Sequence, residues 1–118
     1  MMNKVYLCID LKTFFASVEC SERHLDPFKT NLVVADPTRG NGALCLAITP
    51  KMKSMGIQNR SRIFEIPKGV EYITAMPRMH LYMEYSARIY RIYCRFVSPD
   101  DIHVYSIDEC FIDISSYM

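Results

Sequence analysis

Two adjacent carboxylates and a third near the start of the chain are the residues whose types and positions could do chemistry. Asp108 and Glu109 lie within the β-branched and aromatic runs of residues 102–114, and Asp10 closes the apolar run 5–9. Three acids at expected strand ends, without a His or Cys cluster beside them, favour a hard divalent cation that prefers oxygen ligands. The first hypothesis is therefore metal-assisted phosphoryl transfer.

Each of these acids, considered singly, could also have a purely structural role. Asp10 could accept backbone N–H bonds where a strand gives way to a helix, and Asp108 and Glu109 could be solvated turn residues. Side chains alternate along a strand, so adjacent acids point the same way only where the backbone bends. The end of a hairpin supplies such a bend, and the joint pattern favours the chemical interpretation.

The composition is that of one domain with a core of its own. The chain has 118 residues, half of them apolar, and contains no internal repeat. Its apolar stretches are far short of a membrane span, and no signal peptide is visible, which favours a cytoplasmic protein. The cysteines are odd in number, lack a C-x-x-C pair and lie in apolar runs, so we expect buried reduced thiols rather than disulfides or zinc ligands. They are Cys8, Cys20, Cys45, Cys94 and Cys110.

Charge is unevenly distributed along the chain, although the formal net charge is only +1. Residues 51–68 carry Lys51, Lys53, Arg60, Arg62 and Lys68 against the single acid Glu65. Residues 97–118 contain no Lys or Arg, and their acids are Asp100, Asp101, Asp108, Glu109 and Asp113. A basic and an acidic segment suit a polyanionic ligand held between cations and metal ions. A solvated basic face with acidic turns is equally compatible with this pattern.

Periodicity and turn residues predict the elements that must position the acids. We expect a buried strand at 4–9, a helix at 13–22, strands at 32–35, 44–48 and 71–75, a short helix from Pro50 to Gly56, a long helix at 78–97 and a hairpin at 103–114. Residues 57–70 show no regular pattern. The long helix carries a stripe at helical spacing, which predicts a core face rather than a surface that stacks bases. The stripe consists of Tyr82, Tyr85, Ile89, Ile92, Tyr93 and Phe96, flanked by Tyr90.

Element order and three segments resemble the Y-family (translesion) DNA polymerases. Residues 10–19 resemble the family's opening motif, and residues 106–113 resemble its second catalytic motif. Residues 47–57 are similar to the fingers segment that holds the incoming triphosphate, and residues 82–86 and 89–90 fit the long palm helix. The resemblance spans the whole chain in the right order, and within the family it is greatest to the UmuC-like branch.

The resemblance implies an α+β fold with an incomplete ferredoxin-like polymerase palm, in which an antiparallel sheet packs on a long helix. The palm would comprise residues 1–23 and 77–118, with a small fingers region inserted at residues 24–76. Family members continue through the rest of the palm, a thumb and a little finger. We therefore expect an N-terminal fragment that binds metal and nucleotide weakly and does not polymerise by itself.

By the same resemblance, the acids hold the metals of a template-directed DNA polymerase. Asp10 and Asp108 would bridge two Mg²⁺ ions, and Glu109 would complete the coordination of the catalytic ion. Mn²⁺ could substitute for Mg²⁺. The backbone carbonyl of Leu11 would be a further metal ligand. The reaction implied is nucleotidyl transfer from a dNTP to the 3′-hydroxyl of a primer.

The resemblance also assigns nucleotide contacts. Phe15 occupies the steric-gate position, where its ring would exclude a ribose 2′-hydroxyl, and Phe14 would lie against the sugar and triphosphate through its backbone. Core packing is the alternative for both rings. Lys53 is the expected triphosphate ligand, and Lys51 is a weaker candidate. Many family members have Tyr and Arg where this chain has Pro50 and Lys53, so one phosphate contact is lost and the other is not bidentate.

The implied partners are primer–template DNA and dNTP, with a sliding clamp and a DNA-damage (SOS) response setting suggested by family membership, and no membrane. Leu44 and Leu46 would form a bulky roof over the nascent base pair. Their size would affect which DNA lesions the site accommodates. Two other classes stay open. A nucleotide cyclase-like enzyme would use ribonucleotides and need no gate at Phe15. A non-catalytic module would keep the fold as a surface for partners, although the presence of all three acids argues against it.

Overall fold

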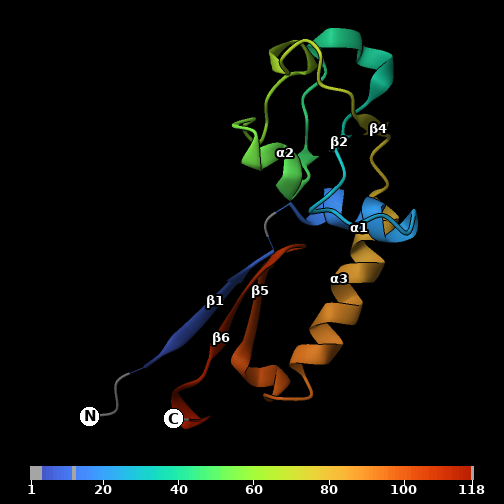
Figure 1. Ribbon diagram of the computed structural model, residues 1–118. Coiled ribbons are helices and arrows are strands. Elements are labelled where there is room, and N and C mark those ends of the chain that lie inside the picture. Colours follow the sequence, from blue (N-terminus) through green and yellow to red (C-terminus); the bar gives the residue numbers. More distant parts are fainter. Residues whose placement is uncertain (1–3, 12, 118) are drawn as a thin grey trace. The chain divides into compact units, whose positions relative to one another are not determined.

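A computed structural model describes residues 4–11 and 13–117 (Figure 1). The chain divides into two compact units, residues 1–12 with 79–118 and residues 13–78. The elements in chain order are β1 (Tyr6–Asp10), α1 (Phe14–Glu22), β2 (Leu32–Val34), β3 (Ala47–Ile48), α2 (Pro50–Ser54), β4 (Ile73–Ala75), α3 (Met79–Tyr93), β5 (Ile102–Ser106) and β6 (Glu109–Asp113). None of the helices described is long and apolar enough to cross a membrane. The expected cytoplasmic location stays a prediction.

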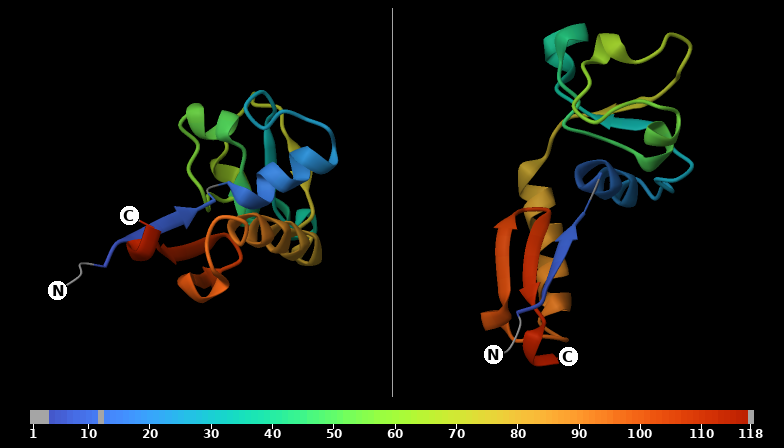
Figure 2. Two further views of the ribbon diagram at one scale, coloured as in Figure 1. Left: turned by 90° about the horizontal axis from the view of Figure 1, so that it is seen from below. Right: turned by 90° about the vertical axis from the view of Figure 1, so that its left-hand side faces the viewer.

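The first unit is an antiparallel three-stranded sheet with a long helix on one face (Figure 2). Strand β6 lies between β1 and β5 and pairs antiparallel with both. The core under α3 contains Ile102, Cys110 and Ile112, against which Tyr90 and Tyr93 of the helix pack. The expected antiparallel sheet with a long helix across it is confirmed.

Strand β1 corrects the expectation of a buried strand at 4–9. Tyr6 is 50% exposed and Leu7 is 47% exposed, and within the strand only Ile9 is half-buried. The reason is position in the sheet, because β1 is an edge strand that pairs with β6 alone among the strands described. Its continuous apolar run therefore does not indicate cover on both faces, as such a run would in the middle of a parallel sheet.

The stripe on α3 is core only in part. Tyr82 is completely buried, whereas Ile92 is 47% exposed and Phe96 is 76% exposed. The helix ends at Tyr93 rather than near residue 97, so Phe96 no longer follows the helical spacing. Because the packed face passes through Tyr90 and Tyr93, Ile92 turns away from the sheet.

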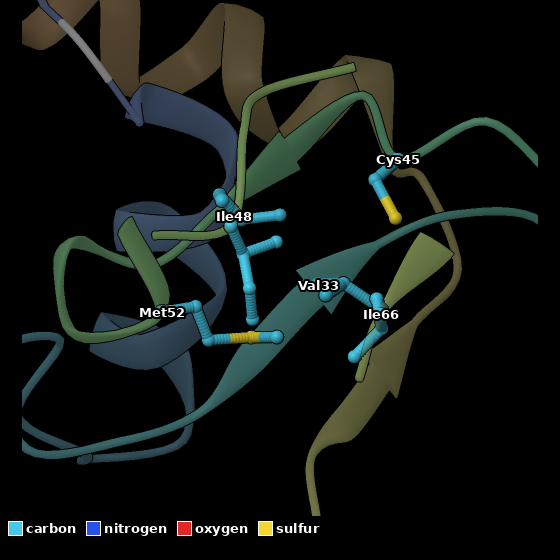
Figure 3. Close-up of a cluster of buried hydrophobic side chains, with 6 residues drawn as sticks. Val33, Cys45, Ile48, Met52 and Ile66 are labelled. Carbon is cyan, nitrogen blue, oxygen red and sulfur yellow. The ribbon is translucent and has the colours of Figure 1, made fainter. Parts of the chain in front are cut away.

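The second unit is built on a mixed sheet with strand order β3-β2-β4. Strand β2 pairs antiparallel with β3 and parallel with β4. The core cluster, shown in Figure 3, consists of Val33, Cys45, Ile48, Met52, Ile57 and Ile66. The strand expected at 44–48 is shorter than predicted, because Leu44 forms only an isolated bridge to Arg62 before β3 begins.

Helix α2 is attached directly to this sheet. Thr49, which is completely buried, donates its backbone N–H to the Leu32 carbonyl at 3.0 Å, and its Oγ1 accepts the Leu32 N–H at 3.3 Å. Pro50 then occupies the first helical position, where its missing N–H costs nothing. Gly56, with φ of +88°, follows the helix in a conformation that suits glycine. The predicted short helix is confirmed.

The boundaries of the compact units differ from those expected for palm and fingers. Helix α1, which the expected boundaries placed in the palm with residues 1–23, packs against β2 and β3 and belongs to the unit of residues 13–78. The second boundary falls between Arg78 and Met79. The names palm (1–23 and 77–118) and fingers (24–76) stay predictions.

Two methionines on α2 and its end give a matched test of the second core. Met52 is completely buried and Met55 is 45% exposed. We expect Met52→Ala to lower the free energy of unfolding by about 2–5 kcal/mol, because it leaves a cavity in the core. Met55→Ala should change it by less than about 0.5 kcal/mol. Urea titration of both variants measures the difference, and equal losses would contradict this core.

The cysteines are free thiols, as expected, but they are not all buried. Cys20, Cys45 and Cys110 are buried, whereas Cys8 on the edge strand is exposed. Burial raises the pKa of the Cys20, Cys45 and Cys110 thiols, which lowers the fraction of reactive thiolate at a given pH.

We therefore expect iodoacetamide at pH 8 to modify Cys8 well before the three buried cysteines. Peptide mass spectrometry of the time course measures the order, and urea-denatured protein, in which the rates should converge, is the control. Labelling of Cys45 as fast as that of Cys8 in the folded protein would contradict the burial described.

Candidate active site

The first unit places two of the three acids opposite each other. Asp10 is the last residue of β1, Glu109 is the first residue of β6, and the two are register partners in the antiparallel pair. Residues opposite each other in such a pair direct their side chains to the same face of the sheet. Asp10 is exposed and Glu109 is half-buried. Both carboxylates therefore stand at one end of the sheet with access to solvent.

The third acid lies in the turn of the hairpin, where three hydrogen bonds fix its position. The Asp108 carbonyl accepts the Leu11 N–H at 2.8 Å, which extends the pairing of β1 beyond its last residue. The Ser106 hydroxyl donates to Asp108 Oδ1 at 3.0 Å. The Ser86 hydroxyl of α3 donates to the Ile107 carbonyl at 2.5 Å. The hairpin end that the adjacent acids required is confirmed.

The donor chemistry fits a divalent cation, although the side chains do not form a closed shell. In the part of the chain that the structure describes, no group of three or more His, Cys, Asp or Glu side chains is arranged to hold a metal ion. Asp10, Asp108 and Glu109 nevertheless offer carboxylate oxygens at one end of one sheet, which is the ligand type that Mg²⁺ prefers. Their role as ligands, with the Leu11 carbonyl, stays a prediction.

A cleft of about 440 Å³ opens beside this turn, between α3 and β5. Its lining is mainly apolar and includes Tyr90 and Val104, together with Ser86 and Ser106. The sequence analysis did not identify the two serines as positioning residues. The role of Ser106 could have been suspected from the sequence, because it lies two residues before Asp108. Ser86 is distant in the sequence and reaches the turn only because α3 packs beside it.

The predicted nucleotide contacts lie in the second unit. Phe14 is 7% exposed and Phe15 is half-buried, and their ring centroids are 6.0 Å apart at an interplanar angle of 54°. The burial of Phe14 agrees with core packing for its ring. Phe15 is only partly covered, and its role as a gate stays a prediction.

The two candidate lysines lie on α2. Lys51 Nζ donates to the Lys29 carbonyl at 3.3 Å, so its ammonium already has a partner within the unit. Lys53 is half-buried on the same helix. The predicted catalytic acids thus lie in the first compact unit, and the predicted nucleotide contacts lie in the second. Lys12, which belongs to the motif at 10–19, lies outside the described residues.

The sequence analysis placed Glu19 in the motif at residues 10–19 but did not predict its burial or its arginine partners. Glu19 of α1 is completely buried and bonds to Arg23 and Arg78. Arg23, four residues along the helix, is a signal that the sequence carries, because residues at this spacing are neighbours on a helix. Arg78 is distant in the sequence, and no local pattern connects it with Glu19.

Comparisons with known proteins show the family of the chain and the likeness of its fold. A family model described as the impB/mucB/samB family matches residues 9–118. The DNA repair protein homolog YozK of Bacillus subtilis is 38% identical over 103 residues, which cover 86% of this chain and 90% of YozK. DNA polymerase IV 2 of Bacillus subtilis is 35% identical over 116 residues, or 98% of this chain, which spans only 27% of that polymerase. The fold is that of a solved Y-family DNA polymerase chimera of Dbh and Dpo4 segments, with a TM-score of 0.78, 23% identity and coverage of 95% of this chain and 33% of the chimera.

Removal of the Ser86 hydroxyl tests how the acidic turn is held. Ser86→Ala should lower the free energy of unfolding by about 0.5–1.5 kcal/mol, because one hydrogen bond to the Ile107 carbonyl is lost. It should also speed amide hydrogen exchange at Leu11, whose N–H is bonded to the turn. The matched control is Ser54→Ala, which removes a serine-to-carbonyl bond of equal length in the second unit. Equal exchange at Leu11 in both variants would refute this role of Ser86.

Proposed function

Because this chain belongs to the impB/mucB/samB family, we propose that it is the N-terminal part of a template-directed DNA polymerase of the translesion class. The observation that carries the proposal is the placement of Asp10, Asp108 and Glu109 at one end of the β1-β6-β5 sheet. The chain spans 27% of its relative DNA polymerase IV 2, so the activity is proposed for a protein that carries this chain together with the remaining domains.

Asp10, Asp108 and Glu109, with the Leu11 carbonyl, are the groups that would hold the divalent cations, two Mg²⁺ in our proposal. Bound Mg²⁺ would lower the pKa of the primer 3′-hydroxyl and neutralise charge on the triphosphate. The chain's own contribution is to fix the donors: Ser106 restrains one oxygen of the Asp108 carboxylate, and the Leu11 N–H restrains the Asp108 backbone. Preorganised donors spare the reaction the cost of arranging them.

The dNTP would be contacted from the second unit. Phe15 lies in the first turn of α1, which packs against β2 and β3. Lys53 lies on α2, which begins two residues after β3. One sheet therefore supports both the proposed gate for the sugar and the proposed cation for the triphosphate, with Phe14 and Lys51 beside them. Primer–template DNA is the proposed macromolecular substrate. A sliding clamp, a DNA-damage (SOS) response and a cytoplasmic location complete the proposal by family membership.

Primer extension by the full-length gene product tests the reaction class. We expect Mg²⁺-dependent dNTP addition on intact and abasic templates. Asp10→Asn and Asp108→Asn should each reduce it on the order of 1,000-fold or more, because each removes a charged metal donor. Asp100→Asn is the matched control, since Asp100 is an exposed acid of the same unit, and its activity should equal that of the parent.

Absence of extension by well-folded full-length protein would overturn the enzyme proposal and favour a non-catalytic module. Incorporation of ribonucleotides as readily as deoxynucleotides would instead contradict the gate at Phe15. Conversion of a ribonucleotide to a cyclic product, without any primer, would identify the cyclase-like alternative.

A further inference from the structure

Glu19 is unlike the other acids of this chain. Of the Asp and Glu residues that the structure describes, it alone is completely buried, with 0% exposure. It lies in the middle of α1, nine residues after Asp10, and no catalytic or nucleotide-binding role is assigned to it. Burial of a carboxylate is costly unless charged hydrogen-bond donors surround it.

Two arginines supply those donors. Arg78 Nε donates to Glu19 Oε2 at 3.0 Å, and Arg78 Nη2 donates to Glu19 Oε1 at 2.5 Å, which is the bidentate geometry of a strong charged pair. Arg23 Nη1 also donates to Oε1, and to the Glu19 carbonyl at 3.3 Å. The side chains of Arg78 and Arg23 are 48% and 35% exposed, so only the carboxylate is fully desolvated.

The cluster ties α1 to a distant part of the same unit. Arg78 lies three residues after Ala75, the last residue of β4, and β4 pairs with β2. A helix that needed only its own stability could rely on the pair between Glu19 and Arg23, which lies within the helix. The bond to Arg78 spans 59 positions and fixes the helix relative to the end of the sheet.

The start of α1 also stores strain. Thr13, directly before the helix, has φ of +58°, which is unfavourable for a β-branched residue. Such a conformation persists only where the surrounding structure holds it in place. Thr13 is buried, and its carbonyl accepts the Ser17 N–H at 2.9 Å. The helix that follows this strained residue must therefore be held firmly against the sheet.

We propose that Glu19 is a positioning residue, which together with Arg78 and Arg23 holds α1 and thereby fixes the ring of Phe15. Phe15 lies four residues before Glu19, one turn away on the same side of the helix. A shift of α1 would move the ring by a comparable amount. The consequence for sugar discrimination rests on the proposed function, whereas the consequence for the position of Phe15 does not.

The test compares three variants of the chain by nuclear magnetic resonance. Glu19→Gln keeps the size and removes the charge, and Arg78→Lys keeps a cation and removes the bidentate geometry. Arg39→Gln is the matched control, because it removes an ion pair with Asp36 that is exposed and lies in the same unit. We expect the first two variants to shift the ring signals of Phe15 and to speed amide exchange at Ser17 about tenfold, while Arg39→Gln changes neither.

Binding of dATP and ATP in the presence of Mg²⁺ adds a readout that a purely structural role would not move. Wild type and Arg39→Gln should prefer dATP, and Glu19→Gln and Arg78→Lys should lose part of that preference at temperatures well below their melting points. If Glu19→Gln does not fold, Arg78→Lys, in which Arg23 still pairs with the carboxylate, carries the test.

Unchanged Phe15 signals and Ser17 exchange in folded Glu19→Gln or Arg78→Lys would overturn the positioning role, whatever the nucleotide results. Shifted Phe15 signals in a protein whose wild type shows no preference for dATP would support the positioning role and count against the proposed gate. The two proposals can therefore fail separately.

Discussion

The register between β1 and β6 is the constraint on which the acidic site depends. Ile9 is opposite Cys110, and Asp10 is opposite Glu109, so the apolar pair faces the core under α3 and the acidic pair faces away. A slip by one residue would exchange the two faces, burying acids and exposing the core. The alternating burial of β6, in which Cys110 and Ile112 face the core, thus determines the face on which Glu109 stands, and pairing with β1 places Asp10 beside it. The bond from Leu11 to the Asp108 carbonyl then fixes the last residue of the arrangement.

In the second unit, two local energetic costs lie on one helix. Thr13 has a strained backbone at the start of α1, and Glu19 is a fully buried carboxylate in the middle of it. A buried ion pair stabilises a fold little better than apolar packing would, so stability alone does not account for the cluster around Glu19. Proteins tolerate such local costs where geometry matters, and α1 is the helix that carries Phe15. The core around Val33 and Met52, by contrast, consists of packed apolar side chains and, among the residues described, contains no buried charge.

The sequence was sufficient for the features that depend on local patterns. The hairpin around Asp108 followed from β-branched runs with a break between them, and α2 followed from Pro50 and Gly56. What could not be predicted depends on partners distant in the chain. The exposure of β1 reflects its place at the edge of the sheet. The parallel pairing of β2 with β4 cannot be inferred from the residues of either strand. The bond between Glu19 and Arg78 joins residues that only the folded sheet brings together.

The structure of α2 gives a physical reason for the departures from the family pattern at Pro50 and Lys53. Pro50 opens this helix directly after Thr49, whose backbone and hydroxyl are bonded to Leu32 of the sheet. The helix start is thereby fixed through the sheet, and the position of Pro50 contributes shape rather than a donor. Any contact with phosphate from this helix must then come from its lysines. One of the three ammonium donors of Lys51 is engaged by the Lys29 carbonyl, so Lys53 is the first candidate for the proposed triphosphate contact and Lys51 the second. Lys53 lies three residues after Pro50, on the same side of the helix, where a single ammonium would act without the bidentate geometry of arginine.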